Sequence, residues 1–462
     1  MPLAKHFTVP LPYFPDSAAL FDRIAQQTWA VFLDSGHPNT QQGRYDVIAA
    51  DPICTLLTRA ESTEISQAGI SRSEQQDPFQ LLQQQLDGLP IPGPQETGLP
   101  LPFRGGAIGY FAYDLARCIE KLPALAKDEE QIPDMAVGIY DWALVVDHQQ
   151  QQSHLTGFCD GEKRQQLIAL FCQPPAPTPS PAFQVTGHVS ANMDQAAYNH
   201  AFERIQYYLK EGDCYQVNLT QRFAAPCRGD PWQAYQRLRQ LNAAPFAAYL
   251  NLPDVQVLSS SPERFLKLCD GQVETKPIKG TRPRKPDLLA DQQQLAQLQH
   301  SPKDRAENLM IVDLLRNDLG KTCRKGSVRV PSLFAIESYA TVHHLVSTVT
   351  GTLADDQQAV DLLKSCFPGG SITGAPKIRA MQIIEELEPH RRGLYCGAIG
   401  YISCDGNMDT NIAIRTLVHS HGSIRFWAGG GIVHDSIAAE EYQECFDKAA
   451  ALLALLKQYS VV

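Results

Sequence analysis

The sequence predicts an α+β protein, and three observations carry this prediction. Up to residue 172, short runs of β-branched and aromatic residues are punctuated by Gly, Pro and Asp, as is typical of antiparallel strands joined by turns. From residue 184 onward, long helical stretches alternate with further strand-like runs. A proline-rich segment separates the two patterns.

The N-terminal part, residues 1–172, has three clear strand-like runs. They are WAVFLDS, GAIGYFAY and MAVGIYDWALVVD, at residues 29–35, 106–113 and 135–147. β-Branched and aromatic side chains favour strands because they pack well on a pleated surface. We expect these runs to form antiparallel sheet.

The segment QPPAPTPSPAF, residues 173–183, is the clearest break in composition. A run of prolines favours extended polyproline geometry and can neither continue a helix nor enter a central strand. We interpret it as a linker between the N-terminal part and the C-terminal part, residues 184–462.

The C-terminal part has helical stretches at residues 196–212, 304–320 and 439–459. The last of these has leucines at positions 452, 453, 455 and 456 on an apolar stripe, so we expect it to pack against the core. Strand-like runs lie at residues 397–403, 410–418 and 423–429.

Composition excludes several classes of protein. The chain has 40 basic and 50 acidic residues among 462, a net charge of −10, which argues against general nucleic-acid binding. Prolines interrupt the N-terminus where a signal peptide needs an apolar helix, and no stretch approaches the ~20 apolar residues of a membrane span. We therefore expect a cytoplasmic protein with neither nucleic-acid nor membrane partners.

The twelve cysteines are scattered singly, without a C-x-x-C pair. This spacing argues against a zinc site and favours reduced, mostly buried thiols.

Two helical stretches each place acidic residues three apart, Asp304 with Glu307 and Glu441 with Glu444. Positions i and i+3 share a helix face, and four converging carboxylates would repel one another unless a cation lay between them. All-oxygen ligation suits Mg²⁺. Two solvated helix faces remain an alternative, although Lys448, one turn beyond Glu444, adds an anion contact to the same face.

Two further features could bind a carboxylate. Gly429, Gly430 and Gly431 lack the Cβ that would keep an anion from backbone N–H groups, although a tight turn explains them too. Arg415 lies on an apolar strand-like run, and its planar fork suits a carboxylate in two-point contact. A structural ion pair is the competing explanation.

Two residues are candidates for the chemistry itself. A partly buried Glu263 could retain a proton near neutral pH and act as a general acid, or it could simply pair with Arg264. We expect Lys279, in the run ETKPIKGTRPR, on a short, tight turn, where a nearby cation such as Lys276 would lower its pKa and free its amine. A surface lysine is the alternative.

Taken together, these segments resemble the chorismate-utilising enzyme family, which includes the anthranilate, isochorismate and salicylate synthases. The resemblance runs from about residue 190 to 457, through PIKGTRPR, ENLMIVDLLRNDLG, FPGGSITGAPKIRAM, CGAIGY, IAIRT, AGGGIV and EYQECFDKA. The N-terminal part is similar more loosely, through LDSG and GRYDVIAADP. The resemblance implies an anthranilate-synthase-like fold, in which two antiparallel sheets form a sandwich and helices pack outside.

The resemblance also assigns roles to single residues. It implies that Glu307 and Glu444 bind Mg²⁺, with Asp304 and Glu441 acting through water, and that Glu263 protonates the departing 4-hydroxyl of chorismate. The metal and Lys448 would bind the ring carboxylate. The enolpyruvyl carboxylate would be held by Arg415, Tyr395 and the backbone of Gly429, Gly430 and Gly431, and the pocket would be lined by His344, Gly280, Thr281 and Ser371.

Lys279 indicates which reaction the chain performs. The family's anthranilate synthases have a small residue at this position, whereas its members that aminate C4 have lysine. The implied product is 4-amino-4-deoxychorismate, formed through a covalent Lys279 adduct at C2, with amination at C2 as the alternative. Water-using members place a lysine base where this chain has Gln216, which cannot deprotonate water.

No segment resembles a glutamine amidotransferase, so we expect a separate glutaminase subunit to supply ammonia. Five residues match segments that bind tryptophan in relatives: Asp34, Ser35, Tyr45, Pro245 and Phe246. A packed contact between sheet and loop explains them equally well. A tryptophan-sensing protein without catalysis is a further hypothesis, which the intact Glu263, Lys279, Glu307 and Glu444 oppose.

Overall fold

The computed structural model describes residues 5–40, 43–93, 100–173, 180–339 and 342–461. Most of the expected linker, residues 174–179, lies outside the described residues.

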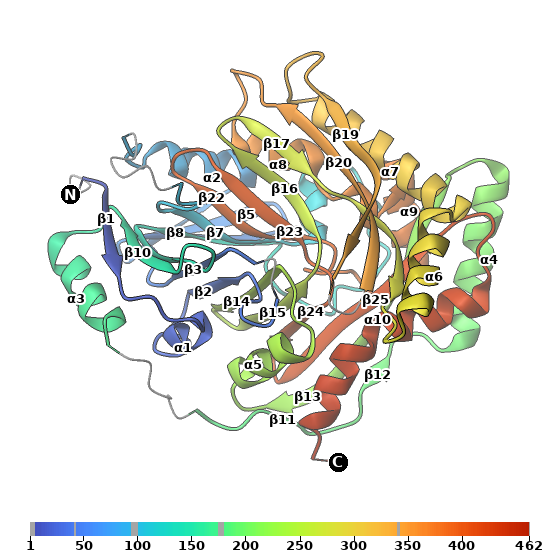
Figure 1. The fold of residues 1–462 in the computed structure, drawn as a ribbon, viewed down its shortest axis with the longest axis horizontal. Helices are drawn as coiled ribbons and strands as arrows, with labels where there is room; N and C mark the ends of the chain where they lie inside the picture. Colours follow the sequence, from blue (N-terminus) through green and yellow to red (C-terminus); the bar gives the residue numbers. More distant parts are fainter. Residues whose placement is uncertain (1–4, 41–42, 94–99, 174–179, 340–341, 462) are drawn as a thin grey trace.

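Within the described residues the strands form two large sheets (Figure 1). In spatial order the first sheet contains β1 (Phe7–Leu11), β10 (Gln152–Gly157), β9 (Trp142–Asp147), β3 (Tyr45–Ala49), β2 (Ala30–Asp34), β14 (Phe246–Leu252), β15 (Val255–Ser261), β24 (Thr416–Ser420), β25 (Ser423–Ile432), β13 (Gln216–Arg228) and β11 (Gln184–Val185), with β12 (Ser190–Ala191) and β21 (Gly374–Ala375) also paired to β13.

The second sheet carries the strand on which Lys279 lies. Its order is β18 (Ile278–Pro283), β20 (Val342–Thr352), β17 (Gln272–Thr275), β16 (Arg264–Cys269), β23 (Met408–Ile412), β22 (Ala398–Ser403), β7 (Gly106–Phe111), β8 (Met135–Tyr140), β4 (Cys54–Arg59), β5 (Ser62–Gln67) and β6 (Ile70–Glu74), with β19 (Arg329–Ser338) paired to β20.

Strands from both parts of the sequence meet in each sheet. In the first, β2 pairs antiparallel with β14, so that Asp34 lies opposite Ala247. In the second, β7 pairs antiparallel with β22, from Gly106 opposite Ser403 to Phe111 opposite Ala398. The N-terminal and C-terminal parts are thus joined by continuous hydrogen-bonded ladders.

The orientation of side chains alternates along the strands, which gives each sheet two apolar faces. Side chains of successive strand residues point to opposite faces, and on β2 Val31 belongs to a buried cluster between the sheets whereas Ala30 and Phe32 belong to a cluster beneath the helices. The cluster between the sheets combines Ile108 and Tyr110 of β7 with residues of β2, β9 and β14. Each sheet therefore has an apolar inner face and an apolar outer face.

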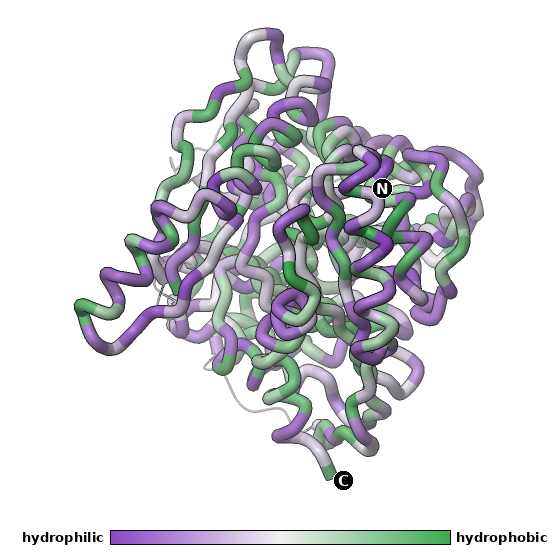
Figure 2. The backbone as a smooth tube through the Cα atoms, turned by 90° about the vertical axis from the view of Figure 1, so that its right-hand side faces the viewer, coloured by the Kyte–Doolittle hydropathy of each residue, from purple (hydrophilic) through white to green (hydrophobic). Residues whose placement is uncertain are grey.

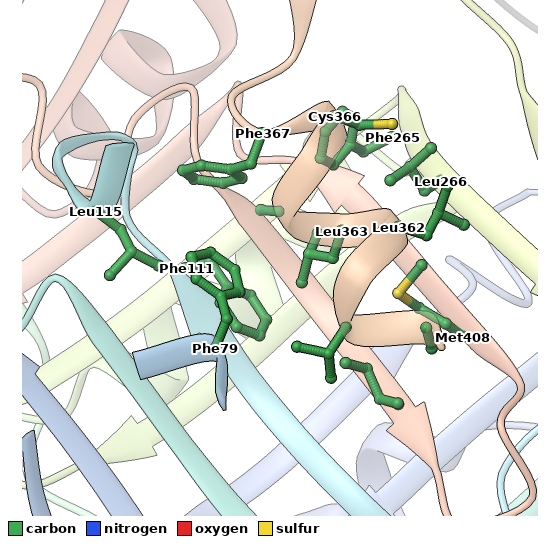
Figure 3. Packing of buried hydrophobic residues seen from close by; sticks show 14 of the residues in the cluster. Phe79, Phe111, Leu115, Phe265, Leu266, Leu362, Leu363, Cys366, Phe367 and Met408 are labelled. Atoms are coloured by element: carbon green, nitrogen blue, oxygen red, sulfur yellow. The ribbon is translucent and has the colours of Figure 1, made fainter. Parts of the chain in front are cut away.

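The helices cover the outer faces. They are α1 (Ser17–Phe21), α2 (Pro78–Asp87), α3 (Gly161–Phe171), α4 (Gln195–Glu211), α5 (Pro231–Leu241), α6 (Leu288–Gln299), α7 (Pro302–Gly320), α8 (Ala359–Cys366), α9 (Lys377–Leu387) and α10 (Ala438–Gln458), with two 3₁₀ turns, η1 (Tyr113–Cys118) and η2 (Gly370–Ile372). Figure 3 shows α8 lying on the second sheet, where Leu362, Leu363 and Phe367 meet Phe79 and Phe111.

Most of the predicted elements are confirmed, with two corrections. The run 135–147 is two strands, β8 and β9, because the chain passes from the second sheet to the first at Asp141. The run 410–418 is also broken, between β23 and β24, and residues 413–415 belong to neither strand.

Hydrophobic and hydrophilic stretches alternate along the chain (Figure 2). Within the described residues no helix combines the length and the apolar character that crossing a bilayer requires.

Candidate active site

Lys279 lies on β18 at a β-bulge, not on the tight turn that the sequence suggested. The pairing of β18 with β20 shifts register between Ile278 and Thr281, so Lys279 and Gly280 fall outside the regular ladder. Bulges re-aim side chains beside active sites. Gly280 has a φ of +84°, and a Cβ there would come within 2.9 Å of Asp304 Cγ, so glycine is needed for both the backbone and the close approach of α7.

Ser371 connects Lys279 with Glu263. The Lys279 ammonium Nζ donates to the carbonyl oxygen of Ser371 at 3.0 Å. The Ser371 hydroxyl donates to Oε1 of Glu263 at 2.8 Å. Lys279 lies on β18 and Glu263 lies directly before β16, so one residue of η2 holds both proposed catalytic side chains.

Burial shifts the pKa values of both groups toward their neutral forms. The pKa of Glu263, whose side chain is buried, is raised by desolvation, against the opposing effects of the Ser371 hydroxyl and Lys279. Desolvation also lowers the pKa of Lys279, against the carboxylates of Glu307 and Glu263, with Lys448 adding to the lowering. The neighbouring cation is thus Lys448, and the expectation for Lys276 is wrong: Lys276 forms an ion pair with Glu337 at 3.0 Å.

The structural alternative for Glu263 is also wrong, because Arg264 pairs elsewhere. Its guanidinium binds Asp409 at 2.9 Å and Glu274 at 3.1 Å. Glu263 remains free of a salt bridge within the described residues.

Three of the four candidate metal carboxylates lie near one another: Glu307 of α7, and Glu441 and Glu444 of α10. Desolvation raises the pKa of Glu307, and Asp304 and Glu441 raise it further, against the effect of Lys279 and Lys303. A Cβ on Gly430 would come 3.0 Å from Glu444 Oε1 and 3.2 Å from Glu441 Oε2. Gly430 therefore allows both glutamates of α10 to approach β25.

Cations already compensate part of this acidic charge. Lys448 Nζ lies 2.6 Å from Glu444 Oε1 and donates to the Gly429 carbonyl at 2.9 Å. The pKa of Glu444 is lowered, because Lys448, Lys303 and Lys279 together outweigh desolvation. Asp304 forms an ion pair with Arg282 at 2.9 Å and so faces β18.

In the part of the chain that is described, no three His, Cys, Asp or Glu side chains form a ready-made metal cage. Mg²⁺ does not need one, since it commonly binds through one or two carboxylates and keeps several waters. Glu307 and Glu444 offer oxygen ligands only, which fits that ion.

The three glycines lie inside a strand, so the interpretation as a tight turn is wrong. Gly429, Gly430 and Gly431 pair with Thr220, Leu219 and Asn218 of β13. β24 pairs with β25 only as far as Phe426. Beyond Phe426, the described residues of β25 pair with β13 on one side only. Alternate N–H groups of an antiparallel strand point to each side, which leaves backbone donors at this edge for a ligand.

Arg415 lies at the break between β23 and β24, with a φ of +50°, and not within a strand as predicted. Within the described residues its guanidinium has no hydrogen bond or ion pair, although desolvation lowers its pKa. Arg415 is close enough to His344 to affect the pKa of that imidazole. This pKa is lowered to about 4, mainly by desolvation and next by the charge of Arg415. A partly buried, unpaired guanidinium beside a neutral imidazole is suited to bind an anion.

Of the remaining predicted pocket residues, His344 lies on β20 and Tyr395 lies in the turn before β22. His344 lies opposite Thr281, whose hydroxyl is 2.8 Å from His344 Nδ1. Tyr395 stacks on Trp427, with ring centroids 5.9 Å apart and an interplanar angle of 8°. Gln216 is buried, donates to Asn218 at 3.0 Å, and has no partner for Oε1 within the described residues.

A second cavity of about 810 Å³ lies between the sheets, and its lining includes Ile278 but not Lys279. All five residues matched to tryptophan binding line it: Asp34, Ser35, Tyr45, Pro245 and Phe246. Asp34 is fully engaged by Arg239 at 2.8 Å and Tyr235 at 2.9 Å, whereas the buried hydroxyl of Ser35 has no partner among the described residues. The wall of the cavity therefore mixes apolar and charged side chains, and the Ser35 hydroxyl and Arg104 Nε are unpaired among the described residues.

Sequence reasoning missed one buried pair, Arg392 with Glu388, that anchors η2. An acid and a base four residues apart can pair on any helix surface, so only the fold reveals that this pair is buried beside the site.

The fold and the site define an enzyme whose candidate catalytic groups gather beside η2, with its substrate-binding candidates on both sheets and on α10. The chain matches the family described as chorismate binding enzymes over residues 30–454, and it belongs to that family.

Individual relatives agree with this assignment. The chain is 49% identical over 447 residues to aminodeoxychorismate synthase component 1 of Salmonella typhimurium, which covers 96% of this chain and 97% of the relative. It is 38% identical over 436 residues to anthranilate synthase component 1 of Thermus thermophilus, covering 93% of each chain. Its structure matches anthranilate synthase component I from Streptococcus pneumoniae with a TM-score of 0.76 and 31% identity, over 89% of this chain and 92% of that one. The expected family and fold are confirmed.

Proposed function

We propose that this chain acts as the chorismate-aminating component of an aminodeoxychorismate synthase, which converts chorismate and ammonia to 4-amino-4-deoxychorismate on the route to 4-aminobenzoate and folate. The observation that carries the proposal is the chain of contacts from Lys279 through Ser371 to Glu263. The similarity to aminodeoxychorismate synthase component 1 of Salmonella typhimurium supports the same reaction.

In the first half of the reaction, the neutral amine of Lys279 attacks C2 of chorismate. Both ring double bonds shift by one position, from C1–C2 and C5–C6 to C6–C1 and C4–C5, and the bond from C4 to its hydroxyl breaks. Glu263 donates the proton that lets the hydroxyl leave as water, and the nitrogen of Lys279 becomes a secondary ammonium bonded to C2. This step requires a neutral lysine and a protonated glutamic acid. Burial shifts both pKa values in the direction that the step requires.

In the second half, ammonia attacks C4 and both double bonds shift back, so that the C2–N bond breaks and the secondary ammonium of Lys279 leaves as a neutral amine. The carboxylate of Glu263 accepts the proton that the new C4 ammonium loses. Chorismate and ammonia have then become 4-amino-4-deoxychorismate and water, and both side chains have returned to their starting forms.

Substrate binding needs cations for two carboxylates. Arg415, unpaired within the described residues, and Tyr395 would hold the enolpyruvyl carboxylate, while Lys448 would hold the ring carboxylate. Glu307 and Glu444 would bind Mg²⁺, with Asp304 and Glu441 acting through water. A bound Mg²⁺ would supply positive charge beside the ring carboxylate.

Amination at C2, as in an anthranilate synthase, is the competing reaction. A lysine nucleophile bonded to C2 occupies the carbon that this reaction would aminate. The higher identity to aminodeoxychorismate synthase component 1, 49% against 38%, points the same way.

A separate glutaminase subunit would deliver ammonia, as the designation "component 1" of the relative suggests. We also propose that the 810 Å³ cavity binds tryptophan, with the Ser35 hydroxyl as a polar contact.

Product identification tests the proposed function. The chain is incubated with chorismate, Mg²⁺ and ammonium, and the products are separated by liquid chromatography with mass detection. Because the 2-amino and 4-amino products have the same mass, parallel samples receive aminodeoxychorismate lyase. We expect 4-aminobenzoate only with the lyase; anthranilate or isochorismate would contradict the proposal.

A further inference from the structure

The most completely satisfied buried ion pair near the site is that of Arg392 with Glu388. Arg392 is 1% exposed and lies between α9 and β22. Its Nε donates to Glu388 Oε2 at 2.9 Å and its Nη2 to Glu388 Oε1 at 2.7 Å, which is the two-point geometry of a strong guanidinium–carboxylate pair.

The rest of the guanidinium joins two backbone segments. Nη1 donates to the carbonyl of Ile372 at 3.0 Å, and Nη2 also donates to the carbonyl of Asn218 at 3.0 Å. Ile372 ends η2 and directly follows Ser371. Arg392 therefore ties η2 to β13 from inside the protein.

Glu388 fixes the other side of this junction. Its Oε1 accepts hydrogen bonds from the Thr220 N–H at 3.0 Å and the Thr220 hydroxyl at 2.8 Å. The Asn218 N–H donates to the Thr373 carbonyl at 2.9 Å, so the segment after Ser371 is held to β13 at two places. The Arg392 guanidinium carbon also lies 5.8 Å from the ring centre of Tyr395.

We infer that Arg392 and Glu388 are positioning residues, which set η2 so that Ser371 can contact Lys279 through its carbonyl and Glu263 through its hydroxyl. The inference rests on the proposed function, in which these two side chains perform the chemistry. Neither Arg392 nor Glu388 needs to touch the substrate, because both act through Ser371.

The geometry of arginine makes this role specific. Its planar fork reaches four acceptors at once, Oε1 and Oε2 of Glu388 and the carbonyls of Ile372 and Asn218. A lysine ammonium keeps the charge but has only three donors on one nitrogen and cannot span both carbonyls and the carboxylate. A displacement of η2 by about 1 Å can cost on the order of 100-fold in rate, because both catalytic contacts move with it.

The test compares Arg392→Lys, Glu388→Gln and Ser371→Ala with the double variant Arg392→Lys/Ser371→Ala, assayed with ammonium as nitrogen source. Arg425→Lys is the matched control. Arg425 is also buried in an ion pair, with Glu130 at 2.7 Å, but its hydrogen bonds go to Glu130, Ser420 and Ser423 and not to a proposed site residue. The measurements are kcat, KM for chorismate, and Tm.

We expect Arg392→Lys and Glu388→Gln each to lower kcat about tenfold or more, with KM changed less than about threefold. The double variant should be no less active than the less active of the two single variants, because both substitutions disrupt the same chain of contacts through Ser371. Arg425→Lys should lower Tm but keep kcat. The inference is overturned if the fold losses in kcat of Arg392→Lys and Ser371→Ala multiply in the double variant. It is also overturned if Arg392→Lys and Glu388→Gln both fold and keep full kcat.

These ratios to wild-type activity hold whichever product forms. If the wild-type chain makes anthranilate, the proposed function fails while the double-variant comparison still decides the positioning role.

Discussion

The carbonyl oxygen of Ser371 accepts a hydrogen bond from Lys279 Nζ at 3.0 Å. The same serine donates its hydroxyl to Glu263, so a residue predicted only to line the pocket connects the proposed nucleophile with the proposed acid. Both proposed catalytic groups therefore depend on the placement of η2.

The first prediction concerns the nucleophile. Replacement of Lys279 by Ala should slow formation of 4-amino-4-deoxychorismate at least about 100-fold, because ammonia must then displace the hydroxyl without a covalent intermediate. Chromatography with mass detection measures the product. Lys276→Ala, which removes a lysine of the same run that pairs with Glu337, should retain activity. Wild-type rates in Lys279→Ala would rule out the lysine mechanism.

The second prediction concerns the metal. Glu307→Gln should abolish Mg²⁺-dependent turnover, because an amide lacks the charge that the ion requires. Activity is measured against Mg²⁺ concentration and in EDTA. Asp313→Asn is the control, since Asp313 lies on the same helix and pairs with Arg316 at the surface. Full wild-type activity in EDTA would refute the metal assignment.

The third prediction concerns pH. Glu263 has a raised pKa and, in the proposed mechanism, acts while protonated, so activity should be present below this pKa and lost as the pH rises through it. The Ser371 hydroxyl stabilises the carboxylate form, and Ser371→Ala should raise the pKa further. The alkaline limb of kcat should then move up on the order of one pH unit.

The profile for Ser371→Ala must be recorded at a fixed concentration of free ammonia, since ammonium itself titrates in this range. Ser365→Ala, which removes a hydroxyl that donates to Leu362 on α8, should leave the limb in place. A limb that moves to lower pH in Ser371→Ala would contradict the assignment of Glu263 as the acid.

The fourth prediction concerns Arg415. Arg415→Lys should raise KM for chorismate about 10- to 100-fold, because an ammonium cannot make the two-point contact of a guanidinium with a carboxylate. Initial rates over a range of chorismate concentrations measure the change. Arg228→Lys, at an exposed position, serves for comparison. An unchanged KM would show that Arg415 does not bind the substrate.

The fifth prediction concerns the 810 Å³ cavity. If tryptophan binds there, it should raise Tm when added or be released on denaturation, because a ligand that binds only the folded state stabilises it. Differential scanning fluorimetry and mass detection of released tryptophan measure the two outcomes. L-Phenylalanine is the control ligand, and Ser35→Leu should remove the effect. Absence of both signals would mean that the cavity has another role.

Much of the fold could be predicted because strand alternation and helix periodicity are local. The helices α4, α7 and α10 lie where the sequence placed them, within one or two residues. The predictions of these two strands were wrong for the same reason. Asp141 and Arg415 interrupt runs whose apolar pattern continues past them. A pattern reports which side chains are buried and does not report where the backbone changes sheet or direction.

The sequence by itself determined the family, the lysine at position 279 and the carboxylates on α7 and α10, because these depend on residue types at fixed spacing. The tertiary structure alone decided that Ser371 joins Lys279 and Glu263 across separations of 92 and 108 residues, and that Arg392 anchors η2 to β13. Contacts over such separations form only when sheets and turns pack together, and burial in that packing is also what shifts the pKa values of the two proposed catalytic groups.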